Sequence, residues 1–131
     1  MAGTAVRESA TLAGLAERAA VARAFVTGVL GRGHPCEADA TLLVSELFGN
    51  SVRHSGSGAP GETVTVSVRV ADGVVRVEVV DRSGPGVPQL HSAGRDAEDG
   101  RGLALVAALA ARWGWYRQRG RTVSWFELRR S

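Results

Sequence analysis

The stretch TVTVSVRVADGVVRVEVVDRSGPG, residues 63–86, decides the fold. Valines alternate with polar residues over 62–70, and the alternation resumes over 74–81. A period of two is typical of a β-strand with one covered face. The Asp72-Gly73 pair between the two runs is a strong signal for a two-residue hairpin turn. The sequence therefore predicts two antiparallel strands joined at this turn.

The second of these strands ends on a carboxylate. Asp81 has the same parity as Val75, Val77 and Val79, so its side chain is expected to point toward the covered face. An unpaired charge in that position is costly. Asp81 is therefore a candidate site residue, although an aspartate before Gly-Pro-Gly is also what an ordinary loop contains.

Helices are predicted on the N-terminal side of the hairpin. Residues 1–11 are poorly patterned, and this end of the chain is expected to supply at most an edge strand. Apolar residues recur at helical spacing over 12–30, and a Gly- and Pro-containing segment ends that helix. A second helix is expected over 37–54. Its inner stripe is formed by Ala40, Leu43, Val44, Leu47 and Ser51.

On the C-terminal side, residues 82–100 form a long polar loop rich in Gly, Pro and Asp. A third helix is expected over 101–113. Strands near 114–119 and 122–129 follow, joined at Gly120. The chain is therefore predicted to be a single α/β domain, residues 1–131, in which helices pack on one face of a mostly antiparallel mixed sheet.

Composition favours a cytoplasmic protein that does not enter the membrane. Of the 131 residues, 44% are hydrophobic and 22% charged, and no apolar run approaches the length of a membrane span. The N-terminus lacks the apolar segment of an export signal. Cys36 is the single cysteine, so no internal disulfide can form. His34 and Cys36 alone do not make a metal site.

All 16 basic residues are arginines, and residues 101–131 hold seven of them against one acid, Glu127. A basic balance of this kind is compatible with nucleic-acid binding. We prefer a solvated basic face, because the excess reflects one-sided arginine usage. No nucleic-acid partner is expected.

Two further segments carry residues suited to chemistry. Glu46, Asn50 and His54 are four residues apart, so they project from one helix face; a solvated polar edge is the alternative. Gly100 and Gly102 open the third helix, whose free N–H groups and dipole favour a phosphate. Glycine near a helix start is common, so this second signal is weak alone.

Three segments, taken together and in this order along the chain, are specific for one protein family. They are ELFGNSVRH (46–54), VVDRSGPGVP (79–88) and GRGLALVAALAARWG (100–114). The chain resembles the GHKL ATPases with the Bergerat fold, over nearly its whole length from residue 12 to 128. Within that group it looks like the short branch of anti-sigma regulatory factors with serine/threonine kinase activity.

The resemblance implies ATP and Mg²⁺ as cofactors. It assigns Asn50 as the magnesium ligand, and an amide oxygen is a hard donor that suits this ion. It assigns Asp81 as the acceptor for the adenine amino group. Glu46 resembles the catalytic base, which would orient or deprotonate a serine hydroxyl attacking the γ-phosphate.

The resemblance also implies a glycine-rich nucleotide site. Gly84 and Gly86 would let the backbone pass close to the base and act as a hinge for an ATP lid over 82–100, mobile over 87–99. The phosphates would lie against the start of the third helix, at Gly100, Arg101, Gly102 and Leu103. For Arg53, His54 and Arg101 a surface role is the alternative to a phosphate contact.

The function that follows from the resemblance is an ATP-dependent serine/threonine kinase that regulates transcription by partner switching. It would phosphorylate an anti-anti-sigma protein and sequester a sigma factor. The alternative is a nucleotide-gated module that holds a partner without phosphotransfer.

A homodimer through the sheet is also predicted. Val74 and Val80 lie on the outer parity of the two valine strands. In residues 122–128 both parities are apolar, with Val123 and Trp125 opposite Phe126 and Leu128. A sheet with only one covered face would expose these residues. Exposed apolar patches often mark interfaces.

Overall fold

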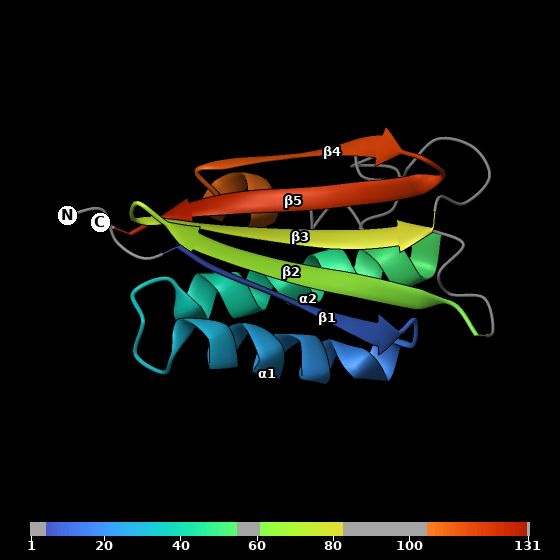
Figure 1. Cartoon of the computed structure of the whole chain (residues 1–131), viewed down its shortest axis with the longest axis horizontal. Coiled ribbons are helices and arrows are strands. Elements are labelled where there is room, and N and C mark those ends of the chain that lie inside the picture. Colours follow the sequence, from blue (N-terminus) through green and yellow to red (C-terminus); the bar gives the residue numbers. More distant parts are fainter. Residues whose placement is uncertain (1–4, 55–60, 83–104, 131) are drawn as a thin grey trace.

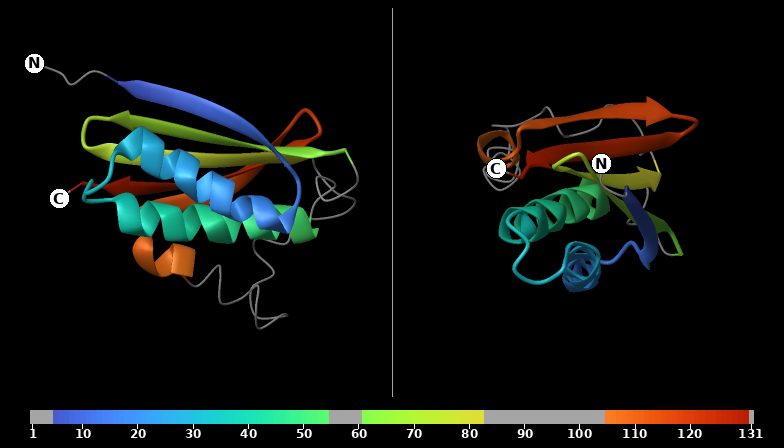
Figure 2. Two further views of the ribbon diagram at one scale, coloured as in Figure 1. Left: turned by 90° about the horizontal axis from the view of Figure 1, so that it is seen from below. Right: turned by 60° about the vertical axis from the view of Figure 1, so that its left-hand side comes forward.

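The computed structural model describes residues 5–54, 61–82 and 105–130. Helices and strands form two layers, and α1 and α2 cover one face of a five-stranded sheet (Figure 1). A short helix over residues 105–109 lies beside α2 on the same face (Figure 2). The elements are β1 (Val6–Ala13), the 3-10 turn η1 (Ala16–Arg18), α1 (Ala19–Leu30), α2 (Glu37–His54), β2 (Thr63–Ala71), β3 (Val74–Arg82), β4 (Arg112–Gln118) and β5 (Arg121–Arg129).

The strand order is β1-β2-β3-β5-β4, and every neighbouring pair is antiparallel. The predicted α/β two-layer architecture is confirmed, but the described strands show no parallel pair and so no mixed sheet. Both hairpins turn through two residues with positive φ: Asp72 and Gly73 at 53° and 76°, and Arg119 and Gly120 at 53° and 77°. Positive φ at both positions is the mark of the type I′ turn, whose twist matches that of the strands.

The core lies between the sheet and the helices α1 and α2. The alternating valines of the central hairpin provide its floor, and the predicted inner stripe of α2 is buried against them. The bounds of α2 agree with the prediction, as do those of the hairpin strands within one residue. The largest fully buried side chains from the helix and sheet layers include Leu43, Phe48, Val66, Val77 and Phe126.

The predicted first helix, 12–30, begins too early. Residues 12–13 belong to the edge strand β1, and the α-helix starts only at Ala19 after the turn η1. Leu12 pairs with Val64 and packs against the core. Backbone pairing with β2 therefore overrides the helical spacing of the apolar residues, because the same leucine can cover the core from a strand.

The predicted third helix, 101–113, extends too far. Its described part ends at residue 109, and Ala111 donates its N–H to the carbonyl oxygen of Glu127 at 2.8 Å. Arg112 already belongs to β4. The alanines before Arg112 favour a helix. Residues from 111 on nevertheless pair with β5, and this pairing adds an edge strand to the sheet.

The outer face of the sheet departs from its predicted exposure. Val123 is only 5% exposed, and Trp125 is half-buried. The guanidinium of Arg76 lies over the Trp125 ring, 4.1 Å from its centroid. Aliphatic and guanidinium groups of arginine can cover apolar surface in this way. The homodimer predicted from this face stays a prediction.

The described helices include none with the length and apolarity needed to cross a bilayer.

Candidate functional site

Five polar side chains are buried where the C-terminal half of α2 meets β3 and β5. On the sheet, Asp81 pairs with Thr122 across β3 and β5, and Val79 pairs with Ser124 one step along. Partners in an antiparallel pair lie on the same face, so the two hydroxyls flank the carboxylate beneath α2. The full set is Asn50, Ser51, Asp81, Thr122 and Ser124.

Asp81 is the most unusual member of this polar cluster. Its side chain is 3% exposed, as its predicted inward parity requires. The Ser51 hydroxyl donates a hydrogen bond to the carboxylate. Atom Oδ1 is nevertheless buried with no hydrogen-bond partner among the described residues. A buried acceptor without a donor costs about 1–3 kcal/mol, and more when it is charged.

Burial raises the pKa of the Asp81 carboxyl to about 6, against the lowering effects of the Ser51 hydrogen bond and the charge of Arg121. A donor placed at Oδ1 would favour the ionised form and bring this pKa down. The site is therefore suited to a ligand that presents an N–H group to Asp81, as the amino group of adenine does.

The helix brings two more predicted site residues to this place. Asn50 is 8% exposed and directly precedes Ser51, the residue that touches Asp81. Glu46 is half-buried one helical turn earlier, about 6 Å along the axis. The side chain of Glu46 makes no hydrogen bond or ion pair with the described residues, so its carboxylate is not engaged by them.

The described residues contain no group of three or more His, Cys, Asp or Glu side chains that would hold a metal unaided. Mg²⁺ in nucleotide sites takes few protein ligands and completes its shell with phosphate oxygens and water. One buried amide oxygen, that of Asn50, fits this pattern.

Gly49 lies beside Asn50 in the helix interior, where glycine costs roughly 1 kcal/mol against alanine. A Cβ at this position would lie 3.2 Å from Nη1 of Arg53. This atom is the end of a flexible side chain that a small movement would carry clear, so the described contacts do not require glycine here. Arg53 itself is exposed.

Several predicted site residues lie outside the described part of the chain. They are Gly84, Gly86, Gly100, Arg101, Gly102 and Leu103, together with the predicted lid after Arg82. His54 ends α2, and its side chain is not described.

The structure adds three residues that the sequence reasoning did not assign to the site: Ser51, Thr122 and Ser124. Ser51 lay on the predicted inner stripe of α2, where it was the one hydroxyl among apolar residues. Thr122 and Ser124 share the parity of Phe126 and Leu128. In each case the sequence places a hydroxyl at a core-facing position, and this feature could have indicated a residue of the site.

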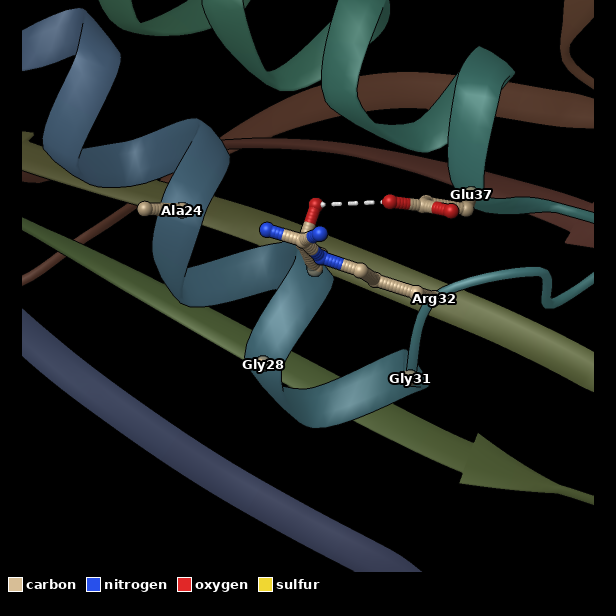
Figure 3. A pocket seen from close by; sticks show the side chains of 6 residues that line it. Ala24, Gly28, Gly31, Arg32 and Glu37 are labelled. Carbon is tan, nitrogen blue, oxygen red and sulfur yellow. Dashed lines mark hydrogen bonds between the residues drawn. The ribbon is translucent and has the colours of Figure 1, made fainter.

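A wide, shallow hollow at the junction of α1 and α2 is a different feature (Figure 3). Its acidic residue, Glu37, accepts hydrogen bonds from the Thr27 hydroxyl at 3.1 Å and the Gly33 N–H at 3.0 Å. Both carboxylate oxygens are therefore used to fix the turn between the helices. This arrangement is structural, and the polar cluster at Asp81 remains the candidate site.

Comparison with known proteins shows the family to which the chain belongs. Residues 11–126 match the histidine kinase-like ATPase domain, and the chain belongs to that family. Over 79 residues it is 43% identical to the uncharacterized protein SCO4941 of Streptomyces coelicolor, a match covering 59% of this chain and 71% of that one. The predicted GHKL relationship is confirmed.

Similarity to solved structures agrees with this family assignment. The chain is similar to the structure of the RsbU and RsbW domains of Rv1364c from Mycobacterium tuberculosis, with a TM-score of 0.69, 25% identity and 95% coverage. It spans 32% of that longer chain. The similarity supports the predicted anti-sigma branch. The histidine kinase domain of the Erythrobacter litoralis EL346 blue-light activated kinase shares the fold at a TM-score of 0.56, 20% identity and coverage of 88% of this chain and 60% of that one.

The raised pKa of Asp81 predicts a pH-dependent stability. The folded chain binds a proton at Asp81 between the unfolded pKa of 3.8 and the folded value of about 6. The free energy of unfolding should therefore fall as pH rises through this window, by about 3 kcal/mol relative to a chain without this group. Urea unfolding of the ligand-free protein and of Asp81→Asn should show that the free energy of unfolding of the wild-type falls relative to that of the variant by about 2–2.5 kcal/mol between pH 4 and 7, which is most of the full difference. Parallel pH curves would contradict the burial of this carboxyl.

Proposed function

We propose that the polar cluster binds ATP with Mg²⁺ and that the chain is an anti-sigma-factor-like serine/threonine kinase. The observation that carries the proposal is the buried Oδ1 of Asp81, an acceptor to which none of the described residues donates a hydrogen bond. Membership of the histidine kinase-like ATPase family makes a nucleotide the natural ligand. The adenine amino group would donate to Asp81, and the Asn50 amide oxygen would coordinate the ion.

The glycine-rich segments complete this proposed site. Gly84 and Gly86 would allow the backbone to approach the base. Gly100 and Gly102 would present N–H groups to the phosphates, with Arg101 and Leu103 beside them. Magnesium neutralises phosphate charge when bound, which matters in a chain with no lysine.

Glu46 is the proposed catalytic base. Its half-buried position one turn before Asn50 would place a carboxylate near the end of the triphosphate. Glu46 would accept the proton of a serine hydroxyl as that oxygen attacks the γ-phosphorus. The bond from the γ-phosphorus to the bridging oxygen breaks, and ADP leaves with that electron pair.

The partners proposed are an anti-anti-sigma protein as phosphate acceptor and a sigma factor held in complex, with both events in the cytoplasm. Support comes from the similarity to the chain with RsbU and RsbW domains and from the resemblance of the three motifs. A nucleotide-gated module without phosphotransfer is the second candidate, because Asp81 and Asn50 serve binding in either case.

Binding is the first test. Calorimetry with ATP or ADP should show magnesium-dependent binding to the wild-type chain, and Asp81→Asn should weaken it while the fold is retained. The carbonyl oxygen of the asparagine introduced by this substitution can still accept the hydrogen bond from the Ser51 hydroxyl. Its NH₂ group would then face the adenine amino group, and two donors cannot form a hydrogen bond with each other. Asn50→Ala should reduce the magnesium-dependent part of the affinity. Folded wild-type protein that binds no nucleotide at millimolar concentration with magnesium would refute the proposal.

Phosphotransfer separates the enzyme from the module. Glu46→Gln should leave ATP affinity nearly intact, since Glu46 contacts neither the base nor the ion in the proposed arrangement. Phosphoserine formation on the partner, read by mass spectrometry, should fall by roughly 10²–10⁴, the usual contribution of a general base. A Glu46→Gln protein that phosphorylates its partner at the wild-type rate would exclude this role. A wild-type chain that binds ATP and partner but transfers nothing would favour the module.

A further inference from the structure

The open face of the sheet carries a row of charges that the nucleotide site does not use. Arg7, Arg69, Arg76, Glu127 and Arg112 are cross-strand neighbours, one on each strand in the order β1-β2-β3-β5-β4. We call this set the arginine row. Neighbouring strands are about 4.8 Å apart, so the row is about 19 Å long. Within the described residues no helix covers this face (Figure 2).

Half of the arginine row, at the β1 edge, is a repulsive arrangement. Arg7 lies opposite Arg69, and Arg69 lies opposite Arg76. Like charges directly opposite one another destabilise a sheet. Arg7 and Arg69 are exposed and form no ion pair with the described residues, and the same holds for Arg129 nearby on β5. The face therefore holds cationic charge that the described fold does not neutralise.

The other two arginines are fixed in place. Arg76 donates to Glu78 and to Glu127, both at 2.9 Å, and Arg112 lies 3.4 Å from the other oxygen of Glu127. Both guanidinium groups also lie over Trp125, at 4.1 and 5.6 Å from its ring centroid.

Gly114 makes room for this stack. A Cβ there would lie 3.2 Å from the Trp125 ring. The centre of the row is thus held by contacts on several sides. Fixed side chains lose little entropy when a ligand binds.

Two adjoining hollows follow the row. The larger, about 240 Å³, is lined by Arg69, Arg76, Arg112 and Arg129, with Asp72 and Glu127 among its acidic neighbours. The smaller, about 60 Å³, is lined by Arg7, Arg69 and Arg76, with Ser67 and Glu78. Each hollow contains more arginines than carboxylates, and the two share Arg69 and Arg76.

We propose that the arginine row is a docking surface for an acidic segment of a partner protein, whose carboxylates enter the two hollows and pair with Arg7, Arg69 and Arg129. Charge complementarity favours such an occupant. Glu127 already shows that a carboxylate fits between these arginines. The length of the row corresponds to about six residues of extended chain.

Other occupants fit this face less well. A nucleic-acid backbone is an uninterrupted run of anions, and it would pass over Glu78 and Glu127. A second copy stacked on the same face would bring arginine rows toward each other. The acidic segment and the predicted homodimer therefore compete for one surface. The nucleotide site lies on the opposite, helix-covered face, so the two bindings can be tested apart.

The test is fluorescence anisotropy with a labelled 12-residue peptide of alternating Glu and Ser, at low salt. Wild-type chain should bind this peptide and not the matching Lys/Ser peptide. The double variant Arg69→Glu/Arg129→Glu should lose at least about tenfold in affinity, because both residues are exposed and neither forms an ion pair with the described part of the chain. Arg32→Glu is the matched control, since Arg32 is exposed in the turn after α1, on the helix layer, and should leave affinity within about twofold. Equal thermal unfolding of all variants verifies the fold.

Specific results would overturn the proposal. These are wild-type protein that does not bind the glutamate peptide at millimolar concentration, or a control that weakens binding as much as the double variant. Binding of oligothymidine in preference to the peptide would assign the face to nucleic acid. Sedimentation showing a dimer that the double variant disrupts, with no peptide binding, would assign it to a second copy. Asp81→Asn should keep full peptide affinity, so failure of the proposed nucleotide function is visible separately.

Discussion

The burial of one carboxylate at the end of β3 is the constraint on which the site depends. An acid at 3% exposure, with one oxygen that has no partner among the described residues, is a cost to the ligand-free fold, and the same burial raises the pKa of this carboxyl. Asp81 could turn outward only if β3 shifted its register by one residue. Such a shift would also expose every core valine of the strand, so the pairing of the hairpin keeps Asp81 buried. The free-energy cost of burying Asp81 therefore remains in the ligand-free fold, at a place where a ligand that donates a hydrogen bond can reduce it.

Helix α2 connects that carboxylate to the rest of the site. Ser51 holds Asp81 by a hydrogen bond, and Asn50 is the preceding residue on the same turn. Glu46 comes one turn earlier. Since the helix is packed firmly on the sheet through Leu43, Leu47 and Phe48, a ligand oriented by Asp81 meets a fixed arrangement of polar groups. In the proposed function, one helix would thus position both the group that binds the base and the group that acts at the phosphate end.

Much of the fold could be predicted because its signals are local. The valine alternation, the Asp72-Gly73 turn and the stripe on α2 each depend on neighbours within a few residues. The errors occur where distant pairing decides. Leu12 packs against the core from a strand because β2 is available to pair with it, and residues 111–113 pair with β5 instead of continuing the helix. Helical spacing and propensity carry no information about such partners.

The same limit applies to the polar features. The parity of Asp81 was enough to predict its burial, but Thr122 joins it only through the register of β3 with β5. The arginine row depends on register between residues 62 positions apart, Arg7 and Arg69. In the sequence these arginines are indistinguishable from a solvated basic face.

The central claim is that Oδ1 of Asp81 accepts a hydrogen bond from the amino group of the adenine base. It is tested most directly by comparing the affinities of ATP and of purine riboside triphosphate, which lacks only the 6-amino group. A hydrogen bond to a charged acceptor contributes about 1.5–3 kcal/mol, so wild-type protein should bind ATP at least about tenfold more tightly. Equal affinity for the two nucleotides would contradict the account.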